Sequence, residues 1–291
     1  MSSLAWLASL TSSTYVLTTL LESIISLLPS LSAFALTPFQ STLLMLILLL
    51  FTLGFNTYLF HLLPKIETLS LFGHLLGFFL VILPLLYLSP KNSANQVFWE
   101  VTNNGGWGSR GVSCGVSQVA VLFCCIGSDS VVHMCMFASS LFSFLSLCFA
   151  PGIDSDICYY CTAEEVANAS QVVPRAMWYS YLLNITMGFL TLTTMLFCIG
   201  DLSTAISTPK PYLHLFSSTG SPLLATFLMI LVFVLIYLGN ITGLATTSRE
   251  IWAFSRDGGF PFSKWISHVS SALLLFELIS CSFICGVLED I

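Results

Sequence analysis

The chain has 291 residues, of which 56% are hydrophobic and only 8% are charged, and its formal net charge is -6. Soluble domains carry about 25% charged residues, so this composition excludes a water-exposed globular surface and indicates an all-α polytopic membrane protein. The eight basic residues form no stripe of the kind that binds nucleic acid, and the lipid bilayer is the partner that we expect.

Three apolar segments in the first third of the chain are long enough to cross a bilayer as helices, which takes about 20 residues each. They run from Leu4 to Leu28, from Leu43 to Leu63 and from Leu69 to Leu88. We expect a tight polar turn at Pro64-Lys65-Ile66-Glu67, between the second and third segments. His74, on the third segment, is interpreted as a packed or interfacial residue and not as a ligand.

The longest polar loop, from Ser89 to Gly111, contains a formal match to the nucleotide-binding pattern G-x-G-x-x-G at Gly106 to Gly111. That pattern requires a preceding strand and a βαβ unit, and here it lies between two membrane spans, so we interpret it as turn chemistry. Cys158-Tyr-Tyr-Cys161 is a single C-x-x-C pair without a second pair or a nearby histidine. The sequence therefore predicts no cofactor and no metal.

The segment from Val112 to Met134 is apolar enough to enter the bilayer, yet it carries Gly127, Asp129 and His133. Ionisable side chains at membrane depth are costly and usually face a cavity or a pathway. A glycine beside them loosens the helix where backbone groups can open towards a solute. We therefore expect a membrane helix that is broken near Ile126 to Asp129. An ordinary buried helix with a satisfied aspartate and histidine stays open as the alternative.

The second half of the chain contains two further full-length spans, which gives about six with the broken helix. The first runs from Met177 to Ile199 and should be closed by a turn at Gly200-Asp201, which a loop rich in Ser, Thr and Pro follows from Leu202 to Ser221. The second runs from Leu223 to Thr246 and should end before Ser248-Arg249-Glu250, and Arg256-Asp257-Gly258-Gly259 should form a turn. A further apolar segment, Ala272 to Leu288, is of marginal length for a span.

The basic residues give a weak orientation signal. One side would hold five of the eight and is predicted to be cytoplasmic. The sequon Asn240-Ile-Thr242 lies inside a span and should stay unglycosylated. The five residues assigned to the cytoplasmic side are Lys65, Arg175, Arg249, Arg256 and Lys264.

Several ordered motifs resemble fungal amino acid permeases of the amino acid–polyamine–organocation superfamily, with the choline and GABA permease branch nearest. The longest is the stretch from Thr246 to Lys264-Trp265, which resembles the end of the family's eighth helix. Gly127-Ser128-Asp129 with His133-Met134 resembles the sixth helix. The other matches are Ser89 to Ala94, Thr102 to Trp107, Glu164 to Val166, Val173 to Met177, and Phe197 to Asp201.

The resemblance implies a partial leucine-transporter-like bundle, a fold of two inverted repeats of five helices. It implies membrane transport of amino acids, choline or related amines, coupled to protons as in the family, and a plasma-membrane location. The first span here resembles the family's third helix, so we expect counterparts of the third to eighth helices only. The family holds its solute between the unwound first and sixth helices. The substrate-binding residues that carry over are Phe123, Cys124, Cys125, Ile126, Gly127, Ser128 and Asp129.

Two departures from the family's pattern set the predicted domain limits. The family passes almost directly from His133-Met134 to Glu164-Glu165, so residues 135–162 are an insert, which we hypothesise to be a translated intron. We expect Pro151 to Thr162 to be irregular. Residues 1–269 are then a partial amino acid permease domain with this insert, and residues 270–291 are a divergent apolar tail. Transcripts that always retained the insert would contradict the intron hypothesis.

Three functions compete at this stage. The first is a transporter, although without the family's first helix the chain would have only half of the solute site and could be inactive. The second is a non-transporting membrane remnant or an interaction partner of a full-length permease. The third, a membrane enzyme, rests on Asp129 and His133 at i, i+4 spacing. No further cluster of acidic, His or Cys residues completes an active site, so we expect no enzyme.

Overall fold

The computed structural model describes residues 2–27, 36–100, 103, 105–122, 169–208, 210–260 and 263–266, and every regular element in these ranges is a helix. The predicted helix break, the insert and the C-terminal tail lie outside the described residues. The elements are α1 (Ser2–Leu27), α2 (Pro38–Tyr58), the 3-10 helix η1 (Phe60–Leu62), α3 (Leu63–Leu88), α4 (Ala94–Phe98), α5 (Arg110–Leu122), α8 (Ala169–Cys198), α9 (Leu202–Ser207), α10 (Pro211–Ser217), α11 (Pro222–Arg256) and α12 (Ser263–Ile266).

Five of these helices are long and apolar enough to cross a membrane, which confirms the all-α membrane class. They correspond to the five predicted spans whose residues the structure describes. Their length follows from the solvent, because a chain in hydrocarbon must satisfy every backbone N–H and C=O within its own helix. The spans are Ser3–Leu27, Pro38–Tyr58, Phe60–Leu88, Val173–Cys198 and Pro222–Arg256.

The predicted starts of two helices are wrong, because each helix contains a proline near its start that the prediction placed outside it. Pro64 to Glu67 is not a turn but the start of α3, because proline is tolerated in a first helical turn, where its N–H has no partner to lose. The chain turns earlier, in η1, where the Leu62 amide donates to the Leu59 carbonyl at 2.8 Å. Similarly, α8 begins at Ala169 and runs through Pro174, where a single bond near the helix start is lost.

The helix α11 also continues past its predicted end at Thr246 to Arg256. Glu250 remains in this helix and accepts a hydrogen bond from the Ser3 hydroxyl of α1, so a charged residue here does not require a loop. The predicted turn after the helix is confirmed: Gly258 has a φ of 74°, and its amide donates to the Ser255 carbonyl at 3.0 Å. A side chain at that φ would be strained, so glycine suits the position.

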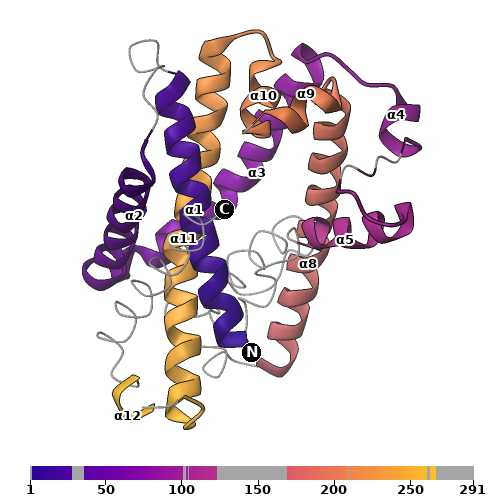
Figure 1. Cartoon of the computed structure of the whole chain (residues 1–291). Coiled ribbons are helices and arrows are strands. Elements are labelled where there is room, and N and C mark those ends of the chain that lie inside the picture. The colour runs from indigo at the N-terminus through magenta and orange to yellow at the C-terminus, as the bar shows by residue number, and fades with distance from the viewer. Residues whose placement is uncertain are drawn as a thin grey trace, which may run out of the picture. The chain divides into compact units, whose positions relative to one another are not determined.

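The described helices fall into two compact units, and the first comprises Met1–His74 and Met229–Ile291. In this unit α1 packs on α2, and α1 and α11 lie alongside one another (Figure 1). Leu10 and Leu244 form one small core contact, with Leu53 of α2 against them. A second small cluster joins Leu7 of α1 to Ile251 of α11.

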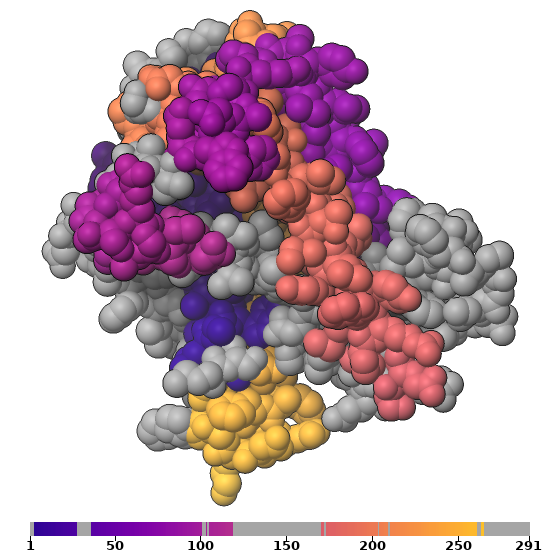
Figure 2. Space-filling view, turned by 90° about the vertical axis from the view of Figure 1, so that its right-hand side faces the viewer, coloured from indigo at the N-terminus to yellow at the C-terminus, as the bar shows by residue number. Residues whose placement is uncertain are grey.

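The second unit is Leu75–Leu228, and its loops cap its helices. Asn92, in the loop before α4, caps the C-terminal end of α8. Its backbone N–H donates to the Phe197 carbonyl at 2.7 Å, and its Nδ2 donates to the carbonyls of Leu196 at 3.2 Å and Gly200 at 2.9 Å. Gly200 has a φ of 72°, as expected for the residue that terminates a helix, which confirms the predicted turn. Figure 2 shows the exposed surface of α8, with α4 and α5 also at the surface.

The predicted loop from Leu202 to Ser221 contains two short helices, α9 and α10. Its polar composition supplies helix caps. Asp201 Oδ2 accepts from the Thr204 backbone N–H at 3.3 Å and from its hydroxyl at 2.8 Å, at the start of α9. The glycine pattern in the long polar loop is turn chemistry as predicted, because Gly106 has a φ of 68° and its amide donates to the Asn103 carbonyl.

Candidate functional site

The predicted solute-binding residues, Phe123 to Asp129, lie outside the described residues, as does His133. The helix α5 leads directly up to them and ends at Leu122. The predicted break and the predicted binding residues are therefore not tested by the structure. What the structure does place is a set of buried polar side chains in the first unit, which occupies two levels along α1 and α11.

The first level joins α1 to α11 midway along both helices. Asn240 of α11 is only 3% exposed, and its Nδ2 donates to the hydroxyl of Thr14 on α1 at 3.3 Å. The hydroxyl of Ser13 donates to Asn240 Oδ1. Polar side chains that bond across helices hold membrane helices together where the hydrophobic effect cannot. The burial of Asn240 agrees with the prediction that its sequon stays unglycosylated.

A second helix, α2, is hydrogen-bonded to α11 beside this first level. Asn56 of α2 donates from Nδ2 to the backbone carbonyl of Ile241 on α11 at 3.0 Å, and to the carbonyl of Thr52 in its own helix at 3.0 Å. Its Oδ1 is buried and has no hydrogen-bond partner within the described ranges. The three helices α1, α2 and α11 are thus fixed by hydrogen bonds at neighbouring positions of α11.

The second level lies where α1 and α3 begin and α11 ends. Ser3 of α1 donates its hydroxyl to Glu250 Oε1 at 3.3 Å. Glu67 of α3 is 3% exposed, and its Oε2, like Nη1 of Arg249 on α11, is buried without a hydrogen-bond partner among the described residues.

These two levels provide hydrogen bonds between helices, and they do not resemble a metal centre. Among the residues that the structure describes, no group of three or more His, Cys, Asp and Glu side chains could hold a metal ion. His74 lies at the surface of α3, and its Nδ1 is within 2.7 Å of the Ser70 carbonyl in its own helix. That local bond is consistent with the interpretation of His74 as an interfacial residue.

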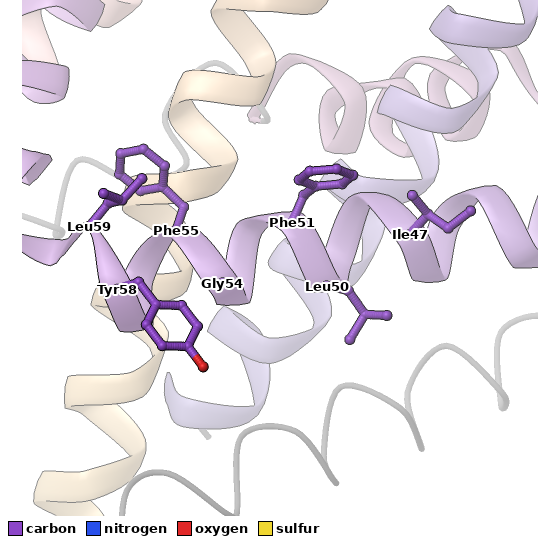
Figure 3. A pocket seen from close by; sticks show the side chains of 7 residues that line it. All are labelled: Ile47, Leu50, Phe51, Gly54, Phe55, Tyr58 and Leu59. Atoms are coloured by element: carbon purple, nitrogen blue, oxygen red, sulfur yellow. The ribbon is translucent and has the colours of Figure 1, made fainter.

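A shallow pocket of about 480 Å³ lies on one face of α2 and the turn after it, between Ile47 and Leu59 (Figure 3). Apart from the Tyr58 hydroxyl, its lining side chains are apolar. Such a surface offers no charge partner for an ammonium or carboxylate group. We therefore do not assign it as a solute site.

The buried polar contacts were missed by sequence reasoning, which treated Glu67, Arg249 and Glu250 as residues of turns and helix ends. The available signal was a polar or ionisable residue within or beside a long apolar run, such as Asn240 among the apolar residues of α11. Sequence alone does not identify the partners, because Asn240 and Thr14 are 226 positions apart.

Comparison with known proteins places these helices in a family. The chain is 28% identical over 245 residues to the choline transporter of Saccharomyces cerevisiae, a match that covers 81% of this chain and 38% of that protein. It is 23% identical over 220 residues to the GABA-specific permease of the same yeast, covering 71% and 33%. It is 29% identical over 143 residues to the thiamine transporter of Schizosaccharomyces pombe, covering 44% and 24%.

The chain spans less than half the length of these curated relatives. No solved structure matches it significantly. The sequence model of the amino acid permease family matches residues 1–288, which is nearly the entire chain. With its membrane-spanning helices, this match confirms the resemblance found in the sequence motifs: the chain is a multi-pass integral membrane protein that belongs to the amino acid permease family.

Proposed function

We propose that this chain forms part of a membrane carrier for small nitrogenous solutes, in the class of amino acids, choline and related amines. The observation that carries the proposal is the family match over residues 1–288. The relatives support the solute class, because choline, GABA and thiamine share a positively charged nitrogen. The role is transport and not catalysis.

The solute would be held by the segment from Phe123 to Asp129, as the resemblance implies. At a break in a membrane helix, the free backbone groups and about half an elementary charge at each half-helix end can meet the charged groups of a solute. The carboxylate of Asp129 adds a full negative charge for a cationic nitrogen. Gly127 would keep the backbone accessible, because it has no side chain to fill the space.

The structure of the first unit supports a carrier in a second way. A carrier needs a rigid part against which other helices can move. Asn240 and Asn56 connect α1, α2 and α11 by hydrogen bonds, which would keep these helices together as a rigid group. We further propose proton coupling and a plasma-membrane location, as the family resemblance implies.

The experiment is uptake of labelled choline, GABA and neutral amino acids into yeast cells that lack their own permeases for these solutes. The full-length gene product that contains these residues is expressed with a fluorescent tag, so that its location is measured in the same cells. We expect saturable uptake of at least one solute, stimulated at acidic external pH and abolished by a protonophore. Saturable uptake that the protonophore does not reduce would contradict proton coupling but not transport itself.

The second candidate function is a non-transporting partner of a full-length permease. It would be favoured by a protein that reaches the membrane, supports no uptake of any solute in the panel and copurifies with another permease. The two functions are thus separated in one set of cells.

A further inference from the structure

The last turn of α3 meets the last turn of α8 within the second unit. Cys198 of α8 is fully buried, and its thiol donates to the Leu85 carbonyl of α3 at 3.4 Å. Leu85 is fully buried as well, and its carbonyl also accepts from the Ser89 backbone N–H at 3.2 Å. A thiol is a weak donor, so the exclusion of water holds this contact more than the hydrogen bond does.

The loop that follows α3 is attached to the same end of α8. Asn92 donates its backbone N–H to the Phe197 carbonyl and its Nδ2 to the carbonyls of Leu196 and Gly200, at 2.7, 3.2 and 2.9 Å. Phe98 of α4 adds an edge-on contact with the Phe197 ring, with the ring centroids 5.9 Å apart. The last carbonyls of a helix have no partner within it, so Asn92 satisfies groups that water would otherwise have to reach.

The residue after α10 is bonded to the end of α3. The Ser218 hydroxyl donates to Ser89 Oγ at 2.9 Å, and Ser89 is only 5% exposed. The helix α10 is itself anchored by two buried side chains, Leu215 and Phe216. The end of α3 is therefore held from two sides, by α8 and by the segment that joins α8 to α11.

We propose that these helix ends form one rigid body, the helix-end block (residues 85–92, 196–200 and 215–218), which stays closed while solute crosses the membrane. Its three segments are connected through shared residues, because the turn that contains Leu85 and Ser89 contacts both of the others. Elements connected in this way open as a single cooperative unit. Only the statement about transport rests on the proposed carrier function.

Amide hydrogen exchange on the 291-residue chain, purified in detergent, tests whether the block is a single unit. Ser218→Ala removes a hydroxyl that bonds to α3 and makes no printed contact with α8, and Asn92→Ala removes two bonds to the end of α8. We expect exchange to become roughly tenfold faster at residues 85–89, 196–200 and 215–219 together in both variants. Thr186→Val is the control, because its exposed hydroxyl bonds only within α8.

The decisive readout is the segment that each variant does not touch. Faster exchange at residues 196–200 in Ser218→Ala, or at residues 215–219 in Asn92→Ala, supports the helix-end block. If one variant yields no folded protein, the other gives the same comparison. Changes confined to the contact that was removed would show that the segments open separately and would overturn the proposal.

A disulfide tests whether the block stays closed during transport. The hydroxyl oxygens of Ser89 and Ser218 are close enough for Ser89→Cys with Ser218→Cys to form a bond under mild oxidation. The linked peptides are identified by mass spectrometry, because the chain already contains ten cysteines. The unmodified full-length gene product and each single variant, treated with the same oxidant, are the controls.

We expect the oxidised double variant to take up solute at the same rate as after reduction. A loss of saturable uptake on oxidation, restored by a reducing agent and absent from the controls, would show that the block opens during transport and would overturn that part of the proposal. If the unmodified protein takes up no solute, the carrier function fails, and the exchange measurement still decides whether the block exists.

Discussion

Replacing Asn240 should loosen the contact between α1 and α11 by a predictable amount. Asn240 makes two interhelical hydrogen bonds, from its Nδ2 to Thr14 and to its Oδ1 from Ser13. Interhelical hydrogen bonds in membrane proteins contribute about 0.6 kcal/mol on average and at most about 1.7 kcal/mol. Two such bonds give about 1.2 kcal/mol, with an upper limit of roughly 3.4 kcal/mol.

The local hydrogen bonds indicate that the loss of stability in Asn240→Leu lies near the lower of these two values. The hydroxyl of Ser13 also lies within 2.9 Å of the Leu10 carbonyl, and the Thr14 hydroxyl already donates to that same carbonyl at 2.9 Å. Neither hydroxyl loses its last partner when Asn240 is removed, so no buried donor is left unsatisfied. We expect a loss of about 1–2 kcal/mol, which is a decrease of roughly 2–6 °C in melting temperature.

Asn240→Asp provides the sharper comparison. It keeps an oxygen that can accept from Ser13, but it places a charge in the middle of a spanning helix, which costs about 2.5–3.5 kcal/mol. We therefore expect Asn240→Asp to be less stable than Asn240→Leu when both are measured by heating and gel filtration. As a control, Thr226→Val alters an exposed hydroxyl that bonds only within α11 and should change little. An unchanged melting temperature for Asn240→Leu would refute this reasoning.

Three further predictions concern backbone and packing. Gly73→Leu should lower stability by about 1–3 kcal/mol in the same thermal assay, because a Cβ at Gly73 would lie 2.9 Å from Leu235 Cδ2, whereas Gly54→Leu should cost little because nothing lies within 4 Å. Gly200→Ala should cost about 1–2 kcal/mol at its φ of 72°. Asn92→Ala should speed amide hydrogen exchange at the end of α8, which loses its two side-chain caps.

Each of these has a result that would contradict it. Equal melting temperatures for Gly73→Leu and Gly54→Leu would show that the close approach of α3 and α11 is not restrictive. Gly239→Ala, in mid-helix with nothing within 4 Å, is the control for Gly200→Ala and should be neutral or stabilising. Unchanged exchange at residues 196–200 in Asn92→Ala would show that the helix end is held without the asparagine.

The membrane-spanning helices could be predicted from sequence because the bilayer imposes one requirement on every span. A segment such as Leu69 to Leu88 must be apolar and about 20 residues long whatever its neighbours are. Helix ends were less predictable. The polar run at Pro64 has the composition of a turn, yet proline is equally suited to a first helical turn, so only the structure distinguishes the two.

The buried contacts were beyond sequence reasoning for a different reason. Glu67 and Arg249 are each common at the end of a membrane helix, where a charge ordinarily reaches the interface. The burial of Glu67 and of the Arg249 Nη1 depends on how the helices pack, and that packing has no local signature. The motifs, in contrast, are local strings, and the stretch from Thr246 to Trp265 was sufficient to indicate the family that the comparison confirmed.

The most direct test of the carrier account is the concentration dependence of solute uptake by the full-length gene product with Gly127→Leu. The matched control is Gly54→Leu, because a Cβ at Gly54 meets no atom within 4 Å. If the backbone around Gly127 binds the solute, Gly127→Leu should abolish saturable uptake while the protein reaches the membrane in normal amounts, and Gly54→Leu should transport like the unmodified protein. Normal uptake by Gly127→Leu would contradict the assigned site, and no saturable uptake of any solute by the unmodified protein would contradict the carrier function itself.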